Sequence, residues 1–209
     1  MAIQLDAPQA RRQVSSTAPL EGLPVREGHF LLESGLHAEA WIDLDTLLLE
    51  PEALKPQIAA LAALVSKHGI SAVCGPLVGG AFVAQALALQ LGIRFYFAER
   101  VQSNPQAGLF QAAYRLPNSQ RNRAAAERFA VVDDVIGAGS AVRATVNELA
   151  SLGAPTMVVG ALLTLGSRAQ GHFTRQGIPV VALGSKEIAM WEPDRCPRCQ
   201  AGIPLHSVS

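Results

Sequence analysis

Two adjacent carboxylates, Asp133 and Asp134, follow the apolar run 129–132 and precede a turn of small residues, Gly137-Ala138-Gly139-Ser140-Ala141. The run is typical of a buried strand, and ligands of an open α/β sheet bind beyond the carboxyl ends of its strands. Backbone N–H groups of such a turn, at the start of a helix, form an anion site. Carboxylates repel bare phosphate but accept hydrogen bonds from sugar hydroxyls. The pattern therefore favours a phosphorylated ribose over the alternative, a solvated Asp-Asp turn.

The segment VVDDVIGAGSA, residues 131–141, resembles the phosphoribosyl-pyrophosphate (PRPP) binding motif of type I phosphoribosyltransferases. It matches neither the GxxxxGK[ST] phosphate loop nor the GxGxxG dinucleotide motif. Gly137 stands where that family usually has Thr or Ser, so one hydroxyl contact to the phosphate is lost and the backbone donors remain.

Three further segments are similar to bacterial orotate phosphoribosyltransferases. Residues 28–37 (GHFLLESGLH), followed by Trp41-Ile42-Asp43, resemble an N-terminal signature of those enzymes. Residues 73–80 (VCGPLVGG) resemble their pyrophosphate-contacting loop, and residues 196–204 (CPRCQAGIP) the tail of some bacterial members. The resemblance spans residues 20–205.

The resemblance implies a role for each matched segment. Asp133, Asp134 and Arg100 are the implied catalytic residues, and the carboxylate pair would also hold Mg²⁺ through water. The implied contacts to PRPP are Asp133, Asp134, Gly137, Ala138, Gly139, Ser140, Ala141, Gly75, Pro76, Leu77, Val78, Gly79 and Gly80. The implied contacts to the nucleobase are Phe30, Ser34, Gly35 and His37.

The sequence departs from the orotate enzymes in the catalytic loop. Where they have an Arg-Lys pair and then a loop lysine, this chain has Glu99-Arg100 and no lysine in residues 101–106. A charge-stabilising donor of this kind contributes about 2.7–4 kcal/mol, so its loss without replacement slows the chemistry roughly a hundredfold. The basic residues that either replace the lysine or belong to a solvated hairpin are Arg115, Arg121 and Arg123.

The segment that resembles the base site also differs, because Glu33 and Ala38 stand where the family often has Lys or Ser. A carboxylate disfavours an anionic base such as orotate unless it points away. Three functions therefore stay open: phosphoribosyl transfer from PRPP to orotate in pyrimidine nucleotide synthesis, transfer to a different base, and a catalytically weak regulatory protein that binds PRPP or a nucleotide.

Three cysteines occur, and two of them form a CxxC pair, Cys196 and Cys199. A structural zinc site needs four ligands. His206 is a possible third ligand, and a second chain could supply more. Two reduced thiols in a turn are the favoured interpretation, ahead of zinc and of a disulfide. Three cysteines do not make a disulfide framework, which favours a reduced, cytoplasmic protein.

The chemistry-bearing segments lie between elements that alternate in type. Apolar spacing and terminal glycines predict helices over 51–68, 81–91 and 141–152. Apolar, β-branched runs predict strands over 70–74, 94–98, 129–133, 156–164 and 178–183. This alternation predicts an α/β fold, a doubly wound and mostly parallel sheet.

Two stretches interrupt that alternation. Residues 28–44 are expected to form a hairpin or small lobe, and residues 99–128 a long inserted lid loop. We therefore expect a flexible N-terminus over 1–19 and a single phosphoribosyltransferase-like domain over 20–209. Within it, 20–50 form a hood, 51–190 the core with the 99–128 insert, and 191–209 the tail with the CxxC pair.

The composition restricts the partners. The 209 residues include 17 basic and 17 acidic side chains, a formal net charge of zero that disfavours nonspecific nucleic-acid binding. An apolar fraction of 49% without a long apolar block disfavours both disorder and a membrane span. The first nineteen residues lack the apolar region of a secretory signal. The expected partners are PRPP, a nucleobase and a second copy of the chain in a homodimer.

Overall fold

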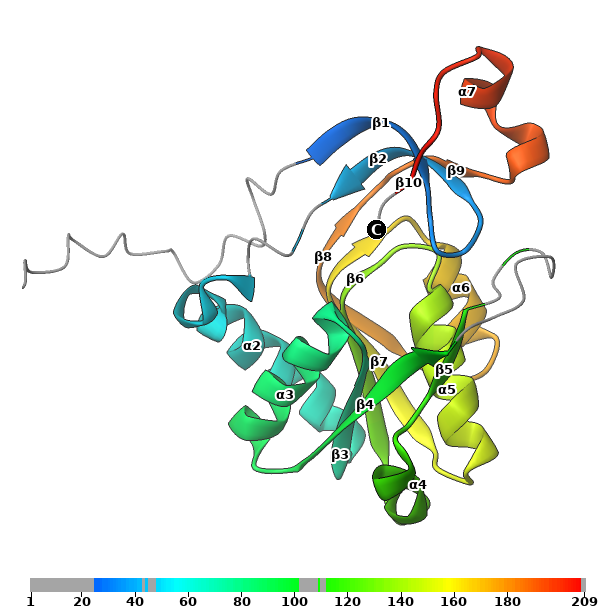
Figure 1. The fold of residues 1–209 in the computed structure, drawn as a ribbon. Coiled ribbons are helices and arrows are strands. Elements are labelled where there is room, and N and C mark those ends of the chain that lie inside the picture. Colours follow the sequence, from blue (N-terminus) through cyan, green and yellow to red (C-terminus); the bar gives the residue numbers. More distant parts are fainter. Residues whose placement is uncertain (1–24, 43, 45–47, 102–108, 110–111, 208–209) are drawn as a thin grey trace, which may run out of the picture.

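The computed structural model describes residues 25–42, 44, 48–101, 109 and 112–207. The expected N-terminal segment 1–19 lies outside these residues. The chain forms a six-stranded sheet flanked by helices, and a small four-stranded sheet lies beyond one end of it (Figure 1).

The large sheet has the strand order β5-β4-β3-β6-β7-β8. All neighbouring pairs are parallel except β4 and β5. Its strands are β3 (Ala72–Pro76), β4 (Arg94–Val101), β5 (Ala113–Arg115), β6 (Phe129–Ile136), β7 (Thr156–Leu165) and β8 (Val180–Lys186). The order reverses between β3 and β6, and this switch point is where open α/β sheets bind their ligands.

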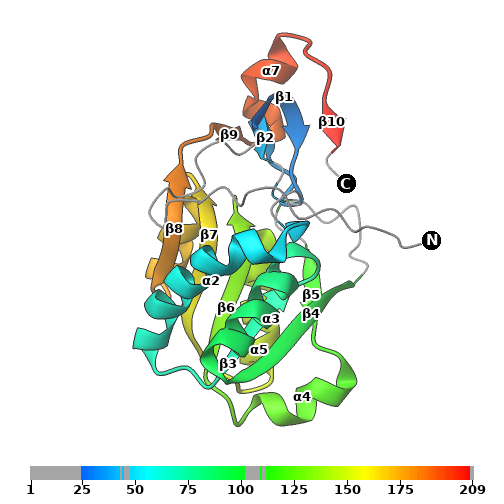
Figure 2. The same ribbon diagram turned by 90° about the vertical axis from the view of Figure 1, so that its left-hand side faces the viewer.

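Helices cover both faces of this sheet, as the alternation predicts (Figure 2). On one face α2 (Pro51–Val65) and α3 (Gly79–Leu91) bury side chains such as Leu61 and Leu87. On the other face α5 (Ser140–Ser151) and α6 (Arg168–Thr174) bury Leu149 and Phe173. The doubly wound, mostly parallel α/β fold is therefore confirmed.

Glycines end the predicted helices where they were expected to. A short 3₁₀ helix (Ser66–His68) extends α2, and Gly69 follows it with φ +63°, while Gly92 follows α3 with φ +66°. A residue with a Cβ is strained in this left-handed region, so both positions favour glycine.

The small sheet combines the two ends of the described chain. β1 (Val25–Leu31) and β2 (His37–Ile42) form the expected antiparallel hairpin. β9 (Met190–Trp191) pairs with β2, and β10 (His206–Ser207) pairs with β1. The tail between them contains a 3₁₀ turn (Pro193–Arg195) and α7 (Pro197–Gln200). We call this sheet with α7 the hood; the tail expected over 191–209 is thus part of it.

The segment expected to be a 30-residue lid loop is largely built into the fold. Glu99–Val101 complete β4, and residues 113–115 form β5 on the edge of the sheet. α4 (Asn118–Ala124) follows and lies at the end of the sheet opposite the hood (Figures 1 and 2). The prediction of one continuous loop was wrong. The short strand and helix bury few apolar side chains, chiefly Tyr114, Leu116 and Ala124, so the sequence shows no clear periodic pattern for either element. Most of the connection 102–112 lies outside the described residues.

Among the described residues, none belongs to a helix long and apolar enough to cross a membrane.

Candidate active site

The acidic pair lies near the carboxyl end of β6, as the sequence predicts. Asp133 is 9% exposed, and its Oδ1 accepts a hydrogen bond of 3.1 Å from the backbone N–H of Asp134. The Oδ1 of Asp134 accepts one of 2.8 Å from the N–H of Val135. Burial, and then repulsion by Asp134, raise the pKa of Asp133 well above its usual value. Two carboxylates held this close favour a partner with hydroxyl donors or a cation.

The glycine-rich loop after β3 lies directly against this pair. A Cβ placed on Gly79 would be 2.4 Å from Oδ2 of Asp134, and one on Gly80 would be 2.6 Å from Oδ1 of Asp133. Both distances are below any real Cβ contact, so only glycine allows this approach. The two segments that the sequence marked separately therefore meet across the switch point between β3 and β6.

The small-residue turn after β6 forms a second concave surface. Gly139 has φ +82° and leads into α5, whose first residue is Ser140. The Ser140 hydroxyl is buried, and no residue that the structure describes is its hydrogen-bond partner. A cavity of about 190 Å³ opens over this turn and is also lined by Ser34 and Met190. A buried, unsatisfied hydroxyl at a helix N-terminus fits an anion such as a phosphate group.

A larger cleft of about 640 Å³ adjoins this cavity, and Glu33 and Asp133 line both. Residues of the hood, the glycine-rich loop, β4, β5, β6 and the start of α5 also line it. They are Arg26, Phe30, Trp41, Ile42, Leu44, Pro76, Leu77, Val78, Gly79, Arg100, Tyr114, Asp134, Val135, Ala141, His206 and Ser207. The cleft is large enough for a sugar phosphate with a second small group.

Glu33 is held by two partners across the cleft. The Tyr114 hydroxyl donates a hydrogen bond of 2.9 Å to its Oε1, and Arg100 Nε lies 3.3 Å from the same oxygen. Burial, and then the charge of Glu33, raise the pKa of Tyr114. The carboxylate that the sequence placed near an anionic base is thus paired with a cation and a neutral hydroxyl.

Comparison with known proteins agrees with these features. Residues 47–177 match the family model described as "Phosphoribosyl transferase domain". The chain belongs to the phosphoribosyltransferase family. The membership predicted from the motif at residues 131–141 is therefore confirmed.

Curated relatives of this phosphoribosyltransferase include orotate phosphoribosyltransferases from three bacteria. The Thermotoga maritima protein is 30% identical over 85% of this chain and 88% of its own length. The Thermus thermophilus protein is 30% identical over 87% and 92%. The Caldanaerobacter subterraneus protein is 29% identical over 87% and 88%. The predicted resemblance to bacterial orotate enzymes thus extends over most of the chain.

Solved structures share the fold. The orotate phosphoribosyltransferase of Aeropyrum pernix aligns with a TM-score of 0.59 at 22% identity, covering 77% of this chain and 87% of that one. The adenine phosphoribosyltransferase of Thermoanaerobacter pseudethanolicus aligns with 0.55 at 17% identity, covering 70% and 88%. Because enzymes named for different bases have this fold, the fold alone does not select the base.

The structure separates the four residues expected to contact the base. Phe30 lines the large cleft, and Ser34 lines the smaller cavity, where its Oγ accepts a hydrogen bond from the N–H of Leu36. Gly35 and His37 occur in neither set of lining residues that the structure describes. Gly35 packs against Leu109, and the His37 ring faces His29 and Cys199 instead.

The arginines proposed to replace the loop lysine also separate. Arg100 reaches the cleft, but Arg121 and Arg123 lie on α4, at the far end of the sheet. Arg121 forms an ion pair with the buried Glu148 of α5. Arg115 projects from β5 and is exposed. Arg121 and Arg123 therefore lie away from the cleft of their own chain, because α4 leads into the amino end of β6.

Tyr114 and His206 line the cleft, although sequence reasoning did not place them there. Tyr114 lies in a segment interpreted as a lid, and His206 was considered only as a zinc ligand. An alternating pattern around Ala113–Arg115 could have indicated the edge strand, but three residues give a weak signal.

Proposed function

We propose that this phosphoribosyltransferase transfers the phosphoribosyl group of PRPP to orotate and releases pyrophosphate. The observation that carries the proposal is the contact between the acidic pair and the glycine-rich loop, next to the turn of Ser140. A ribose between two phosphate groups needs hydroxyl acceptors flanked by two anion sites, and this cleft supplies both. The bacterial relatives named orotate phosphoribosyltransferase support the choice of acceptor.

Each part of PRPP has a matching part of the site. Asp133 and Asp134 accept hydrogen bonds from the ribose 2′ and 3′ hydroxyls. Gly137, Ala138, Gly139, Ser140 and Ala141 hold the 5′-phosphate with the backbone N–H groups of the turn and the Ser140 hydroxyl. The loop from Gly75 to Gly80, in which the Leu77–Val78 peptide bond is cis, holds the pyrophosphate.

The donor set of the acidic pair fits Mg²⁺. Carboxylate oxygens are the ligands this ion prefers, and it keeps several of its waters. Asp133 and Asp134 would hold it, directly or through those waters. When bound, Mg²⁺ neutralises charge on the pyrophosphate.

In the reaction a ring nitrogen of orotate forms a bond to C1 of the ribose and loses its proton to solvent. The bond from C1 to the pyrophosphate oxygen breaks, and its electron pair leaves with pyrophosphate. Because positive charge develops at C1, the chain acts by positioning and by charge stabilisation. Phe30 and Ser34 flank the base. Arg100, at the mouth of the cleft, stabilises the departing pyrophosphate in place of a loop lysine.

A second candidate is a regulatory protein that binds PRPP or a nucleotide with little catalysis. The observation that favours it is the distribution of lysine: the chain's three are Lys55, Lys67 and Lys186, on α2, the following 3₁₀ turn and β8. A phosphoribosyltransferase for an amino-bearing base is a third candidate, favoured by the carboxylate of Glu33.

Four further statements follow from the orotate proposal. The reaction serves pyrimidine nucleotide synthesis, the protein works in the cytoplasm as a homodimer, and neither nucleic acid nor a membrane is a partner. The zero net charge supports the statement that nucleic acid is not a partner.

The decisive experiment is a spectrophotometric assay of orotidylate formation with purified protein, PRPP, Mg²⁺ and orotate, run in parallel with adenine and uracil as acceptors. We expect turnover with orotate alone. Turnover only with another base would contradict the choice of acceptor. No turnover with any base, together with PRPP binding by calorimetry, would favour the regulatory protein.

The substitution Asp134→Asn tests the ribose contact. The loss of charge-assisted hydrogen bonds, about 1.5–3 kcal/mol, is expected to weaken PRPP binding roughly ten- to a hundredfold in calorimetry. Asp194→Asn, at an exposed carboxylate of the tail, is the matched control. An unchanged affinity of Asp134→Asn would refute the assigned contact.

A further inference from the structure

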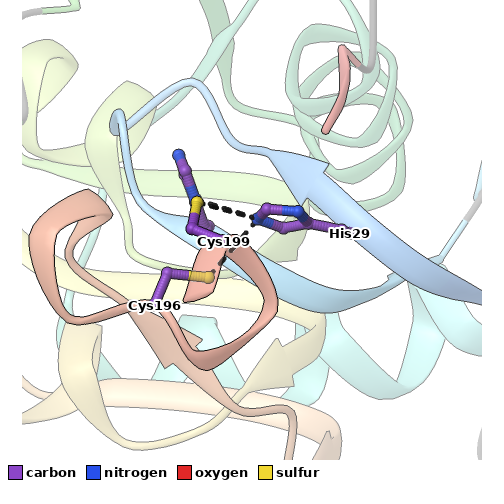
Figure 3. Close-up of side chains that lie close together, drawn as sticks. His29, Cys196 and Cys199 are labelled. Atoms are coloured by element: carbon purple, nitrogen blue, oxygen red, sulfur yellow. Dashed lines mark hydrogen bonds between the residues drawn. The ribbon is translucent and has the colours of Figure 1, made fainter. Parts of the chain in front are cut away.

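Four potential metal ligands meet in the hood, apart from the cleft. His29 lies on β1, His37 begins β2, and Cys196 and Cys199 flank the start of α7. No two of their four ligand atoms lie more than 4.8 Å apart. Figure 3 shows both sulfur atoms directed at the ring of His29.

Four separations between these atoms are close to those of a tetrahedral site. His29 Nε2 lies 2.9 Å from His37 Nδ1, 3.3 Å from Cys196 Sγ and 3.7 Å from Cys199 Sγ. His37 Nδ1 lies 3.3 Å from Cys199 Sγ. Zinc bonds of about 2.0 Å to nitrogen and 2.3 Å to sulfur place tetrahedral ligand atoms ~3.3–3.8 Å apart. Only small side-chain movements separate the cluster from that arrangement.

A hydrogen bond to the backbone determines the tautomer of His29 and leaves Nε2 as the acceptor that faces the cluster. Its Nδ1 lies 2.8 Å from the carbonyl oxygen of Ile203, which can only accept, so Nδ1 carries the proton. In the neutral ring Nε2 then has a single lone pair, and three polar atoms converge on it. A hydrogen bond from one neighbour would leave the other two without that acceptor. A cation at the centre satisfies all four groups, and a carbonyl that orients a ligand histidine is usual in zinc sites.

Burial makes this arrangement unfavourable without a ligand. His29 is 1% exposed, Cys196 is fully buried and His37 is buried, while Cys199 closes the cluster on the solvent side. Buried polar groups need full hydrogen bonding or metal coordination to offset their desolvation.

We propose that His29, His37, Cys196 and Cys199 bind one Zn²⁺ as a structural site. Two imidazoles and two thiolates are a common ligand set for zinc, and four protein ligands leave no open position for catalysis. All four come from one chain, so neither His206 nor a second chain is needed. His206 lies on β10, where its ring packs near Phe30 with centroids 6.0 Å apart.

The ion would join segments that are about 160 residues apart in the sequence. The paired strands that it holds together, β1 with β10 and β2 with β9, carry Phe30, His206 and Ser207 into the wall of the cleft. Zinc would therefore fix the position of the hood over the site. This consequence for the cleft rests on the proposed function, but the metal site itself does not.

The test begins with the metal content of the full chain, purified with reductant and without chelator. Mass spectrometry of the metals is expected to find about one zinc per chain. Titration of the metal-free protein with Co²⁺ is expected to give the visible bands of tetrahedral cobalt and a thiolate charge-transfer band in the near ultraviolet, both saturating at one equivalent. These readouts do not depend on activity.

Two substitutions locate the site. Cys199→Ser and His37→Ala are each expected to lower the zinc content at least tenfold and to remove the thiolate band or the tetrahedral cobalt bands. Cys74→Ala is the matched control, because burial in β3 raises the pKa of that thiol and keeps it away from metal. His206→Ala is expected to keep full zinc.

The proposal is overturned if the wild-type chain retains no zinc and gives no cobalt bands, a result that does not require any variant to fold. A Cys196–Cys199 disulfide in protein purified without reductant, unaffected by added zinc, would also overturn it. If His206→Ala lost its zinc while His37→Ala kept full zinc, the ligand set would be a different one and the proposal would be contradicted.

Discussion

Glu33 places a carboxylate in the cleft where the proposed function requires an anionic base. Its carboxylate contacts the Tyr114 hydroxyl and the Arg100 guanidinium. This pairing engages the guanidinium that an anionic base would otherwise contact. A negative charge a few ångströms from a bound carboxylate costs about 1 kcal/mol or more near a protein surface. On the proposed function, we expect this residue to discriminate between orotate and an amino-bearing base.

The substitution Glu33→Gln keeps the shape of the side chain and removes this charge. We expect kcat/KM for orotate to rise about fivefold, because the repulsion is lost and Arg100 is released. Steady-state kinetics with orotate and PRPP measure the change. Glu39→Gln, also in the hood, serves as the control, since Glu39 contacts the backbone N–H of Ala189 away from the cleft. A fall in kcat/KM for orotate would instead favour the amino-bearing acceptor.

Single residues also show what the sequence could not reveal. Asp133, Asp134 and the glycines of residues 75–80 were found because each belongs to a short contiguous motif. The link from Glu33 to Tyr114 spans 81 positions, and that from His29 to Cys196 spans 167. His37 was assigned to the base because its motif adjoins Ser34, but β2 turns the ring toward the tail. Such contacts depend on which strands pair, and a local sequence pattern does not predict that pairing.

At the scale of elements, the junction of α3 with β6 depends on the absence of a side chain at Gly79. A methyl group there would lie 2.4 Å from Asp134 Oδ2, so Gly79→Ala must displace that carboxylate. We expect PRPP affinity to fall about tenfold or more in calorimetry. Gly171→Ala on α6 is the control, because its nearest neighbour is 3.7 Å away at the end of the Arg175 side chain. Equal affinities for both variants would show that the loop does not hold PRPP.

α4 is a structural element, and its Arg121 pairs with a buried carboxylate. Arg121 neutralises Glu148, which is buried and also accepts a hydrogen bond of 3.2 Å from the N–H of Leu116. Arg121→Ala leaves that carboxylate without its cation and is expected to cost about 1–3 kcal/mol in urea unfolding. Arg123→Ala, two residues further along α4 at an exposed position, should cost under about 0.5 kcal/mol. Activity of Arg121→Ala is expected within twofold of wild type, whereas a hundredfold loss of kcat would restore its catalytic assignment.

The predictability of the elements follows from their length. Long apolar patterns predicted the five parallel strands and the helices α2, α3 and α5, and glycines marked the ends of these helices. All of these elements lie within a few residues of their expected bounds. α4, α6 and β5 are short and bury only one or two apolar side chains each, so a periodic apolar pattern is hard to recognise in them. β9 and β10 have two residues each and form only because the hood places β1 and β2 beside them.

For the whole molecule, an apolar groove of about 500 Å³ lies between α2 and α3. It is bordered by Phe82, 50% exposed, and Leu89, 80% exposed, and Leu54 and Ile58 form its floor. Adjacent exposed apolar side chains on one face are typical of an interface between copies. The proposed homodimer therefore has a candidate surface on the face opposite α5 and α6.

The substitution Leu89→Glu places two like charges across a two-fold interface at this groove. We expect light scattering after size-exclusion chromatography to change the mass from a dimer to the 22.0 kDa monomer at micromolar concentration. Burial of each leucine stabilises by about 1.5–3 kcal/mol, and losing two such contacts weakens association at least a hundredfold. Ala150→Glu, exposed on α5, is the control and should leave the mass unchanged. A dimer that persists in Leu89→Glu would place the interface elsewhere, and a monomeric wild type would contradict the homodimer itself.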